Sequence, residues 1–308
     1  MSEINPKFFV SRVALIVQPV QNQLRGYSAE TGSWASQNVT VNSGEGDQYL
    51  IGTNVALVIQ PVQNQIRAFS GLTGSWANLN VTVNTGEGDT YLIKGNTVLI
   101  IQPVQNQIRA YSAITGTWSS LNVTVNTGEG DTYLIDQDVA LVIQPVQNQI
   151  RAFSAITGTW SSLNVTINSG ENDTYLIDAN LAMIIQPVQN QLRAYNANTG
   201  TWSSLNVTVN AGEGDTYLIS SNVGVVIQPV QNQLRAFSAL TGTWSSLNVT
   251  VNAGEGDTYL IRGNTITVVQ PVQNQIRAFS AITGAWSSLN ITVNAGEGDS
   301  YLMGIDAI

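Results

Sequence analysis

One polar set of residues recurs along the sequence and contains the side-chain types that could do chemistry. Its first copy consists of Gln21, Asn22 and Gln23 in one run and of Glu45 and Asp47 in another. The next copy consists of Gln63, Asn64, Gln65, Glu87 and Asp89. Amides and carboxylates of this kind bind sugar hydroxyls, accept hydrogen bonds from arginine and ligate hard cations. We therefore interpret these residues as ligand-binding candidates, one set in each copy.

The side chains that are missing bear on catalysis. The chain has no histidine and no cysteine, which removes the most common general base, the thiolate nucleophile and the most common metal ligands. Acid and base catalysis needs unlike groups with separated pKa values around one centre, whereas each copy here repeats the same carboxylates. Glu45 and Asp47 could form an acid and base pair, but their place beside a turn favours a structural role. We expect that the protein is not an enzyme.

One loop could hold a metal ion. Asn42, Glu45 and Asp47 are hard oxygen ligands around a short glycine-containing loop, which makes an incomplete Ca²⁺ site. The pattern is far from an EF-hand, and a solvated loop is the favoured interpretation. We therefore expect no metal and no cofactor.

Charge and hydrophobicity limit the partners. The chain has 308 residues and a net charge of −9, and its 11 basic residues are scattered singly, so we expect no nucleic-acid partner. No apolar run is long enough to cross a bilayer, and residues 1–12 do not have the form of a secretory signal. We expect a soluble cytoplasmic protein, although a secreted chain whose leader had been removed would read the same.

The polar set belongs to a repeat that covers almost the whole chain. Tryptophan occurs at a constant spacing of 42 residues, at positions 34, 76, 118, 160, 202, 244 and 286. The near-identical repeats span 13–54, 55–96, 97–138, 139–180, 181–222, 223–264 and 265–306. Repeats of this kind form one continuous array, so we predict a single domain over residues 1–308.

Each repeat contains four short segments with the character of β-strands. In the first repeat, residues 13–17 are a continuous apolar run typical of a strand buried on both faces, and Pro19 ends it. Residues 23–28 and 34–41 alternate apolar and polar side chains, and residues 47–51 follow a glycine loop. Seven repeats of four antiparallel strands predict an all-β, seven-bladed β-propeller. The composition excludes a helical solenoid, and a parallel β-helix is the structural alternative.

The ends of the chain predict how the propeller closes. The chain begins on the second strand of a blade and ends, at residues 299–305, on the first. We expect the carboxyl-terminal strand to join the amino-terminal three strands and close the ring. A closed ring leaves no long sheet edge exposed, so we expect a monomer.

The run Tyr27-Ser28-Ala29-Glu30-Thr31-Gly32-Ser33-Trp34 resembles the Kelch repeat, with an aromatic residue, a threonine and a tryptophan at the same offsets. Leu79, three residues after Trp76, fits the same pattern. Two Kelch features are absent, because Gln18-Pro19 replaces the glycine pair and Ser28 replaces an acidic residue. The resemblance implies a Kelch-like seven-bladed propeller in which Trp34, Trp76, Trp118 and their equivalents pack between blades.

The arginine of each repeat has a structural interpretation. Arg25, Arg67 and Arg109 lie on strands that neighbouring blades cover, and a buried cation needs a partner. We expect the glutamate or aspartate of the same or the next blade, such as Glu45 or Asp47, to be that partner.

Three hypotheses about function remain open besides the enzyme. The leading one is a non-catalytic, multivalent binding module, lectin-like, in which glycans bind repeated polar sites on one face. The alternatives are a protein-interaction scaffold of the Kelch type, with a protein partner, and a symmetric propeller with no identifiable ligand.

Overall fold

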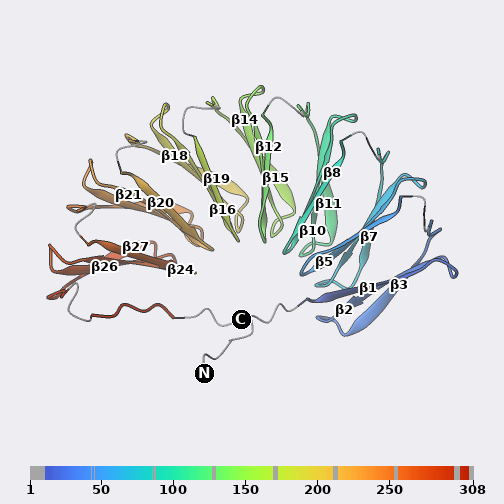
Figure 1. The fold of residues 1–308 in the computed structure, drawn as a ribbon, viewed down its shortest axis with the longest axis horizontal. Coiled ribbons are helices and arrows are strands. Elements are labelled where there is room, and N and C mark those ends of the chain that lie inside the picture. The colour runs from blue at the N-terminus through green and yellow to red at the C-terminus, as the bar shows by residue number, and fades with distance from the viewer. Residues whose placement is uncertain are drawn as a thin grey trace. The chain divides into compact units, whose positions relative to one another are not determined.

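The computed structural model describes residues 11–42, 44, 46–84, 86, 88–126, 130–168, 173–210, 214–252, 256–294 and 299–304. Over these residues the fold is all-β, with no helix (Figure 1). Without a helix, these residues include no helical segment able to span a membrane. The strands form seven antiparallel sheets, which are the predicted blades of a β-propeller.

The strands follow one another along the chain with the same pattern in every repeat. Those of the first three sheets are β1 (Val13–Gln18), β2 (Gln23–Ser28), β3 (Ser33–Asn38), β4 (Gln48–Ile51), β5 (Val55–Gln60), β6 (Gln65–Ser70), β7 (Trp76–Asn80), β8 (Thr90–Lys94), β9 (Thr97–Gln102), β10 (Gln107–Ser112) and β11 (Thr117–Asn122). The remaining four sheets contain β12 (Thr132–Ile135), β13 (Val139–Gln144), β14 (Gln149–Ser154), β15 (Thr159–Asn164), β16 (Thr174–Asp178), β17 (Leu181–Gln186), β18 (Gln191–Asn196), β19 (Thr201–Asn206), β20 (Thr216–Ser220), β21 (Val223–Gln228), β22 (Gln233–Ser238), β23 (Thr243–Asn248), β24 (Thr258–Arg262), β25 (Thr265–Gln270), β26 (Gln275–Ser280) and β27 (Ala285–Asn290).

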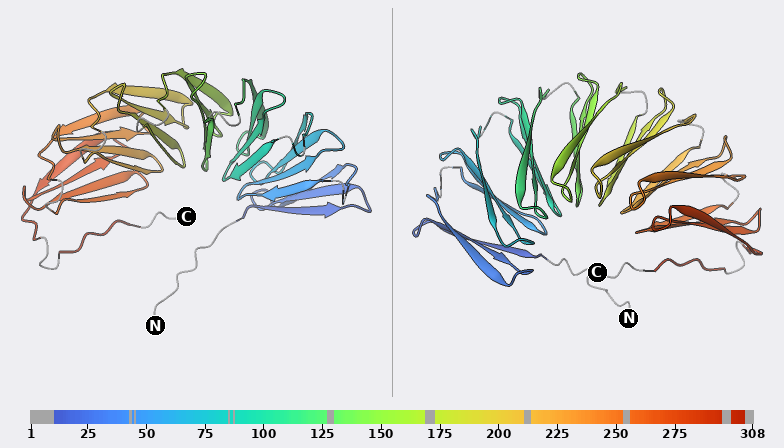
Figure 2. Two further views of the ribbon diagram at one scale, coloured as in Figure 1. Left: turned by 45° about the horizontal axis from the view of Figure 1, so that its top comes forward. Right: turned by 180° about the vertical axis from the view of Figure 1, so that it is seen from behind.

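Six sheets have four strands and the first has three. Each four-stranded sheet combines the last strand of one repeat with the first three strands of the next, as in the order β4-β5-β6-β7. Figure 2 shows from two further directions that each sheet is a short meander of adjacent strands. The sheet β1-β2-β3 lacks a fourth strand, and the described residues 299–304 form no strand. Ring closure is therefore not detected, and it stays a prediction.

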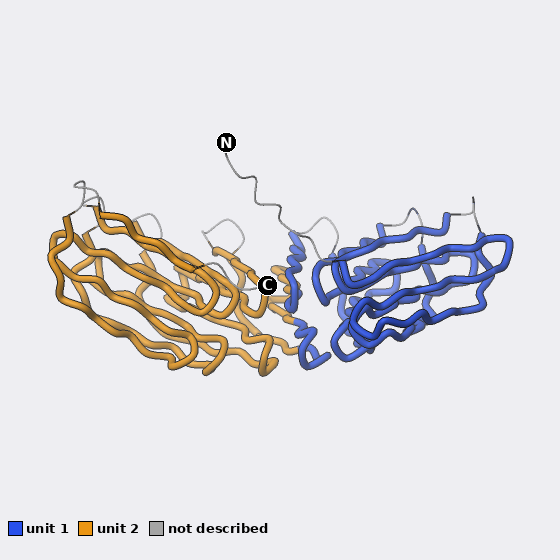
Figure 3. Tube along the Cα trace, turned by 90° about the horizontal axis from the view of Figure 1, so that it is seen from below, with its two compact units in different colours: residues 1–140, 153–160 blue, residues 141–152, 161–308 orange. Residues whose placement is uncertain are grey.

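The chain divides into two compact units (Figure 3). One comprises residues 1–140 and 153–160, and the other comprises residues 141–152 and 161–308. The contacts discussed below lie within one unit or the other. The single domain over residues 1–308 stays a prediction.

The burial of the strands follows from their composition. Every residue of β5, with the sequence VALVIQ, is buried, as expected for a strand covered on both faces. The prediction was wrong for residues 13–17 themselves, because in β1 only Val13 is buried, whereas Ala14 and Ile16 are exposed. Its β-branched side chains suit the extended backbone, and Pro61 cannot continue the hydrogen-bond ladder. β7 alternates between half-buried and exposed positions, because it is an edge strand with one face open to water.

Trp76 packs between neighbouring sheets, as predicted, whereas Trp34 of the first repeat is 53 % exposed and does not fit that prediction. The ring of Trp76 lies 5.2 Å from that of Phe69 on the adjacent strand. Trp76 also packs against Leu24 and Val39 of the preceding repeat, and its Nε1 donates to the carbonyl oxygen of Ala35 at 3.0 Å. Each such bond occupies a backbone acceptor on an edge strand that would otherwise be open to another chain.

Candidate functional site

The predicted polar residues lie together at one end of the strands of each sheet. In the antiparallel meander the end of β5, the start of β6 and the end of β7 lie side by side, with Gln65 opposite both Gln60 and Asn80. We use the term amide site for the asparagine of the first turn, the glutamine that follows it and the asparagine that ends the third strand. In the first repeat these are Asn22, Gln23 and Asn38.

The turn asparagine is held by its backbone. Asn22 has a φ of 52°, in the left-handed region that asparagine tolerates better than most residues. Its backbone N–H donates to the carbonyl oxygen of Pro19, and its Oδ1 accepts from the N–H of Val41 at 3.2 Å. All seven turn asparagines have a positive φ and accept the equivalent bond. Asn22 and Asn64 therefore shape the turn, and a role for them in ligand binding stays a prediction.

The glutamine after the turn connects the asparagine that ends the third strand with the arginine of its own strand. Gln23 Nε2 donates to Asn38 Oδ1 at 2.8 Å, and Gln23 Oε1 accepts from Nε and Nη2 of Arg25. The glutamine-to-asparagine bond is present in all seven repeats, at 2.6 to 2.8 Å. Sequence reasoning missed Asn38 as a site residue, although its invariance among the repeats was a usable signal.

The amide site borders a shallow polar groove. In the fourth repeat the groove is lined by Gln147, Asn148, Gln149, Asn164, Val165 and Thr166. Asn148, Asn164 and Thr166 are exposed, whereas Val165 is buried beneath them. The first glutamine of each predicted set lies at the rim of the groove. In the second repeat it is Gln63, whose Nε2 donates to the carbonyl oxygen of Thr40 in the preceding repeat at 3.3 Å. Gln21, its counterpart in the first repeat, is exposed.

The aspartate of each repeat closes the glycine loop. Asp47 Oδ2 accepts from the N–H of Asn42 at 3.2 Å, from Gln60 Nε2 at 3.1 Å and from Tyr49 OH at 3.4 Å. Asp89 makes the same three contacts in the next repeat. The pKa of Tyr91 is raised by burial, by the negative charge of Asp89 and by the hydrogen bond between Tyr91 and Asp89. Glu45 and Glu87, the other predicted acidic ligands, lie outside the described residues.

The arginine has a different partner from the expected carboxylate. Arg67 is 7 % exposed, and its Nε donates to Gln60 Oε1 at 2.8 Å while its Nη2 donates to Gln65 Oε1. Gln60 in turn donates to Asp47, so a glutamine separates the two charges. Burial lowers the pKa of Arg67, and the charge of Asp47 opposes that shift. Arg109 likewise donates to Gln102, Ser120 and Gln107. Arg25 donates to Gln23 but is exposed, so the predicted burial is wrong for the first repeat.

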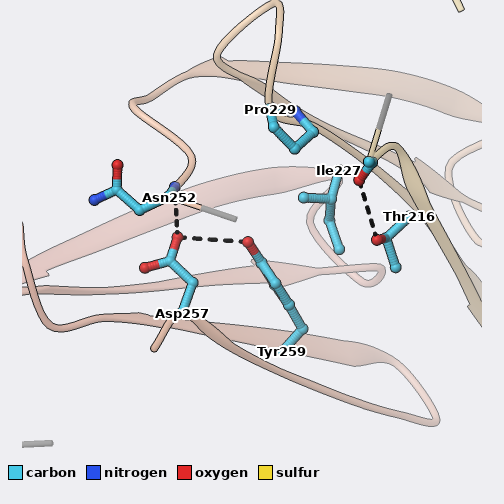
Figure 4. A pocket seen from close by; sticks show the side chains of 7 residues that line it. Thr216, Ile227, Pro229, Asn252, Asp257 and Tyr259 are labelled. Atoms are coloured by element: carbon cyan, nitrogen blue, oxygen red, sulfur yellow. Dashed lines mark hydrogen bonds between the residues drawn. The ribbon is translucent and has the colours of Figure 1, made fainter. Parts of the chain in front are cut away.

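The aspartate also lines a pocket between two neighbouring sheets of one unit (Figure 4). Asp257 and Tyr259 stand opposite Thr216 and Ile227, and Tyr259 OH donates to Asp257 Oδ2 at 3.4 Å. The described residues contain no group of three or more acidic side chains arranged to hold a metal ion. The expectation of no metal stays a prediction, and the alternative Ca²⁺ site is untested because its glutamate lies outside those residues.

Comparison with known proteins identifies no family. No family model matches the sequence, and no curated protein matches it. Virginiamycin B lyase from Staphylococcus aureus is 13 % identical with a TM-score of 0.30, covering 83 % of this chain and 88 % of that one. Hsv2 from Kluyveromyces marxianus is 10 % identical with a TM-score of 0.33, covering 90 % and 93 %. AztD from Citrobacter koseri is 9 % identical with a TM-score of 0.33, covering 92 % and 84 %.

Two sequence-based expectations change with these comparisons. The similar structures are propeller proteins, and the specific resemblance to Kelch repeats is not confirmed. The expectation that the protein is not an enzyme is withdrawn, because two lyases, streptogramin B lyase and virginiamycin B lyase, are among the similar structures. The fold also occurs in proteins that are not enzymes.

Proposed function

We propose that the protein is a multivalent carbohydrate-binding module in which each repeat contributes one amide site. The observation that carries this proposal is the same pair of amides in all seven repeats, a half-buried glutamine that donates to an exposed asparagine, Gln23 and Asn38 in the first repeat. Planar amides at the rim of a shallow groove suit the hydroxyl and carbonyl groups of sugars. The exposed valine beside each site, such as Val146, adds an apolar contact for the C–H face of a sugar ring.

Repetition is what makes such shallow sites useful. A groove open to water holds a single sugar weakly, because little surface is buried and water competes for every hydrogen bond. Linked sites that engage a ligand with several copies of the same sugar gain about 10² to 10⁴ in avidity. The proposal therefore predicts binding to polysaccharides or dense glycan surfaces and weak binding to isolated monosaccharides.

A glycan array tests this proposal. We expect the wild-type protein to bind glycans displayed at high density, and a variant with alanine at every third-strand asparagine to lose that binding. The substituted positions are Asn38, Asn80, Asn122, Asn164, Asn206, Asn248 and Asn290.

The matched control carries alanine at the seven threonines of the turn between the second and third strands, at the other end of these strands. These positions are Thr31, Thr73, Thr115, Thr157, Thr199, Thr241 and Thr283. The control should bind as the wild type does. Circular dichroism verifies that each variant is folded. A wild-type protein that binds no glycan on the array would refute the proposal.

A further inference from the structure

The amides of the site have a fixed orientation. A side-chain amide has an acceptor oxygen at one side and an N–H₂ donor at the other, and the neighbouring groups decide which side points inward. In the fourth repeat, the inward neighbour of Asn148 is the backbone N–H of Ile167, 3.0 Å from its Oδ1. A backbone N–H can only donate, so the Asn148 oxygen must face the protein. Its Nδ2 group is left for the groove.

The orientation of the other two amides follows from an arginine. Arg151 Nη2 donates to Gln149 Oε1, and a guanidinium has no acceptor, so the oxygen of Gln149 is committed to it. Gln149 Nε2 must therefore donate to Asn164, whose Oδ1 accepts at 2.7 Å. The oxygen of Asn164 is thus also committed, and its Nδ2 is left for solvent. Arginine contacts the glutamine oxygen in this way in six of the seven repeats.

The result is a site whose outward amide groups are donors. Each of the two asparagines presents both hydrogens of its Nδ2, and the glutamine has one hydrogen left on Nε2. All three amide oxygens accept hydrogen bonds from other groups of the protein. The other polar side chains that line the groove are half-buried Gln147 and exposed Thr166, whose hydroxyl can donate or accept.

We infer that the amide site binds a ligand group that offers acceptor oxygens, namely a carbonyl or a carboxylate. This inference rests on the proposed function, and within it the ligand is a sugar that carries an N-acetyl group or a uronic acid. An sp² oxygen can accept two N–H bonds, so one carbonyl or carboxylate oxygen can pair with two of these donors. An amino sugar presents an ammonium donor to a surface of donors and is disfavoured.

A panel of four sugars with the same ring tests the inference on the wild-type protein. The probes are the methyl glycosides of glucose, N-acetylglucosamine, glucuronate and glucosamine, titrated while the side-chain amide N–H₂ resonances of asparagine and glutamine are followed by NMR. We expect N-acetylglucosamine and glucuronate to shift these resonances and to bind about tenfold more tightly than glucose, the equivalent of one hydrogen bond. Glucosamine should bind no more tightly than glucose.

The ionic strength distinguishes the two sources of an acceptor oxygen, the carboxylate of a uronic acid and the carbonyl of an N-acetyl group. Binding of glucuronate, which is charged, should change with ionic strength, whereas binding of the neutral N-acetyl sugar should not.

A substitution that reverses the outward polarity gives the second test. Aspartate in place of Asn38, Asn80, Asn122, Asn164, Asn206, Asn248 and Asn290 keeps the oxygen that accepts from glutamine and replaces the outward donors by an acceptor. We expect the affinity for N-acetylglucosamine to fall about tenfold or more. The charge-matched control has aspartate at Thr31 and its six equivalents, in the turn at the other end of the strands, where aspartate before glycine suits a turn. This control should keep wild-type binding.

The outcomes distinguish the inference from the proposed function. Equal affinity for glucose and N-acetylglucosamine, or preference for glucosamine, would overturn the inference and leave carbohydrate binding in place. If none of the four sugars binds while polyvinylpyrrolidone, a carbonyl polymer without sugar, shifts the amide resonances, the inference stands and the proposed function fails. A protein that responds to none of the probes would refute both.

Discussion

Removing one buried hydroxyl should stabilise the protein. The aromatic residue of the second strand is tyrosine in three repeats and phenylalanine in four. Tyr195 is 0 % exposed, and its hydroxyl has no hydrogen-bond partner among the described residues. Its ring lies 5.0 Å from that of Trp202 at 51°, nearly the geometry of Phe153 with Trp160, at 5.3 Å and 51°. Burial raises the pKa of Tyr195, as expected for a hydroxyl that has left water. Tyr195→Phe therefore deletes an unsatisfied polar atom and keeps the packing.

The size of the effect follows from the desolvation of that hydroxyl. An unsatisfied buried donor costs about 1–3 kcal/mol, and part of this gain is offset by the small void left behind. We expect a net gain of about 1 kcal/mol in the free energy of unfolding, which raises the melting temperature by about 2 °C. Calorimetry and urea unfolding measure it, with Tyr27→Phe as the control. Tyr27 is only partly buried, so its substitution should change little. A Tyr195→Phe protein no more stable than wild type would refute the reasoning.

The remaining predictions concern a buried carboxylate, a packed pair and the chain ends. Asp138 is 6 % exposed and replaces an asparagine in a ladder in which Asn54 donates to Asn96 and Asn96 donates to Asp138. Burial raises the pKa of Asp138 above its unfolded value, so ionisation destabilises the fold. Wild type should therefore lose stability relative to Asp138→Asn as the pH rises above about 4, and melting curves that differ equally at pH 3 and pH 7 would contradict this. Gly224→Ala should destabilise by about 1–3 kcal/mol, because a Cβ there lies 1.9 Å from the sulfur of Met183, and adding Met183→Leu should restore most of the loss in urea unfolding. Deleting residues 299–308 should lower the melting temperature sharply if the predicted closure forms, whereas an unchanged cooperative transition would argue against closure.

The strand pattern was predictable because the repeats report it seven times. The second strand was expected at residues 23–28 and lies at Gln23–Ser28. The third was expected to extend to residue 41 but ends at Asn38. Val39 and Val41 are nevertheless 9 % and 7 % exposed, and the N–H of Val39 bonds to the carbonyl oxygen of Asn22. The apolar alternation therefore signalled burial correctly, although beyond Asn38 the chain follows the turn instead of the neighbouring strand.

The partners within the site were less predictable. Carboxylates and amide oxygens both accept from arginine, so composition could not show that Gln60 would stand between Arg67 and Asp47. That choice depends on register, because Gln60 lies opposite Gln65 and both glutamine oxygens meet the same guanidinium. The role of Asn22 could have been found, since an asparagine that ends a Pro-Val-Gln turn is a common residue at positive φ.

The substitutions among the repeats separate positions that folding explains from one that it does not. Recent duplication would make all positions alike, yet even buried hydrogen-bonding positions have changed, with Asp138 in the asparagine ladder and Asn196 in place of serine. The turn asparagine and the glutamine of the amide site are unchanged, and their positive φ and arginine contacts account for that. The asparagine at position 38 only accepts one bond from glutamine, a task that serine, threonine or aspartate could perform at an exposed strand end. Its outward Nδ2 offers two N–H donors, which a serine or threonine hydroxyl reduces to one and which aspartate lacks, so selection for binding would act on those donors.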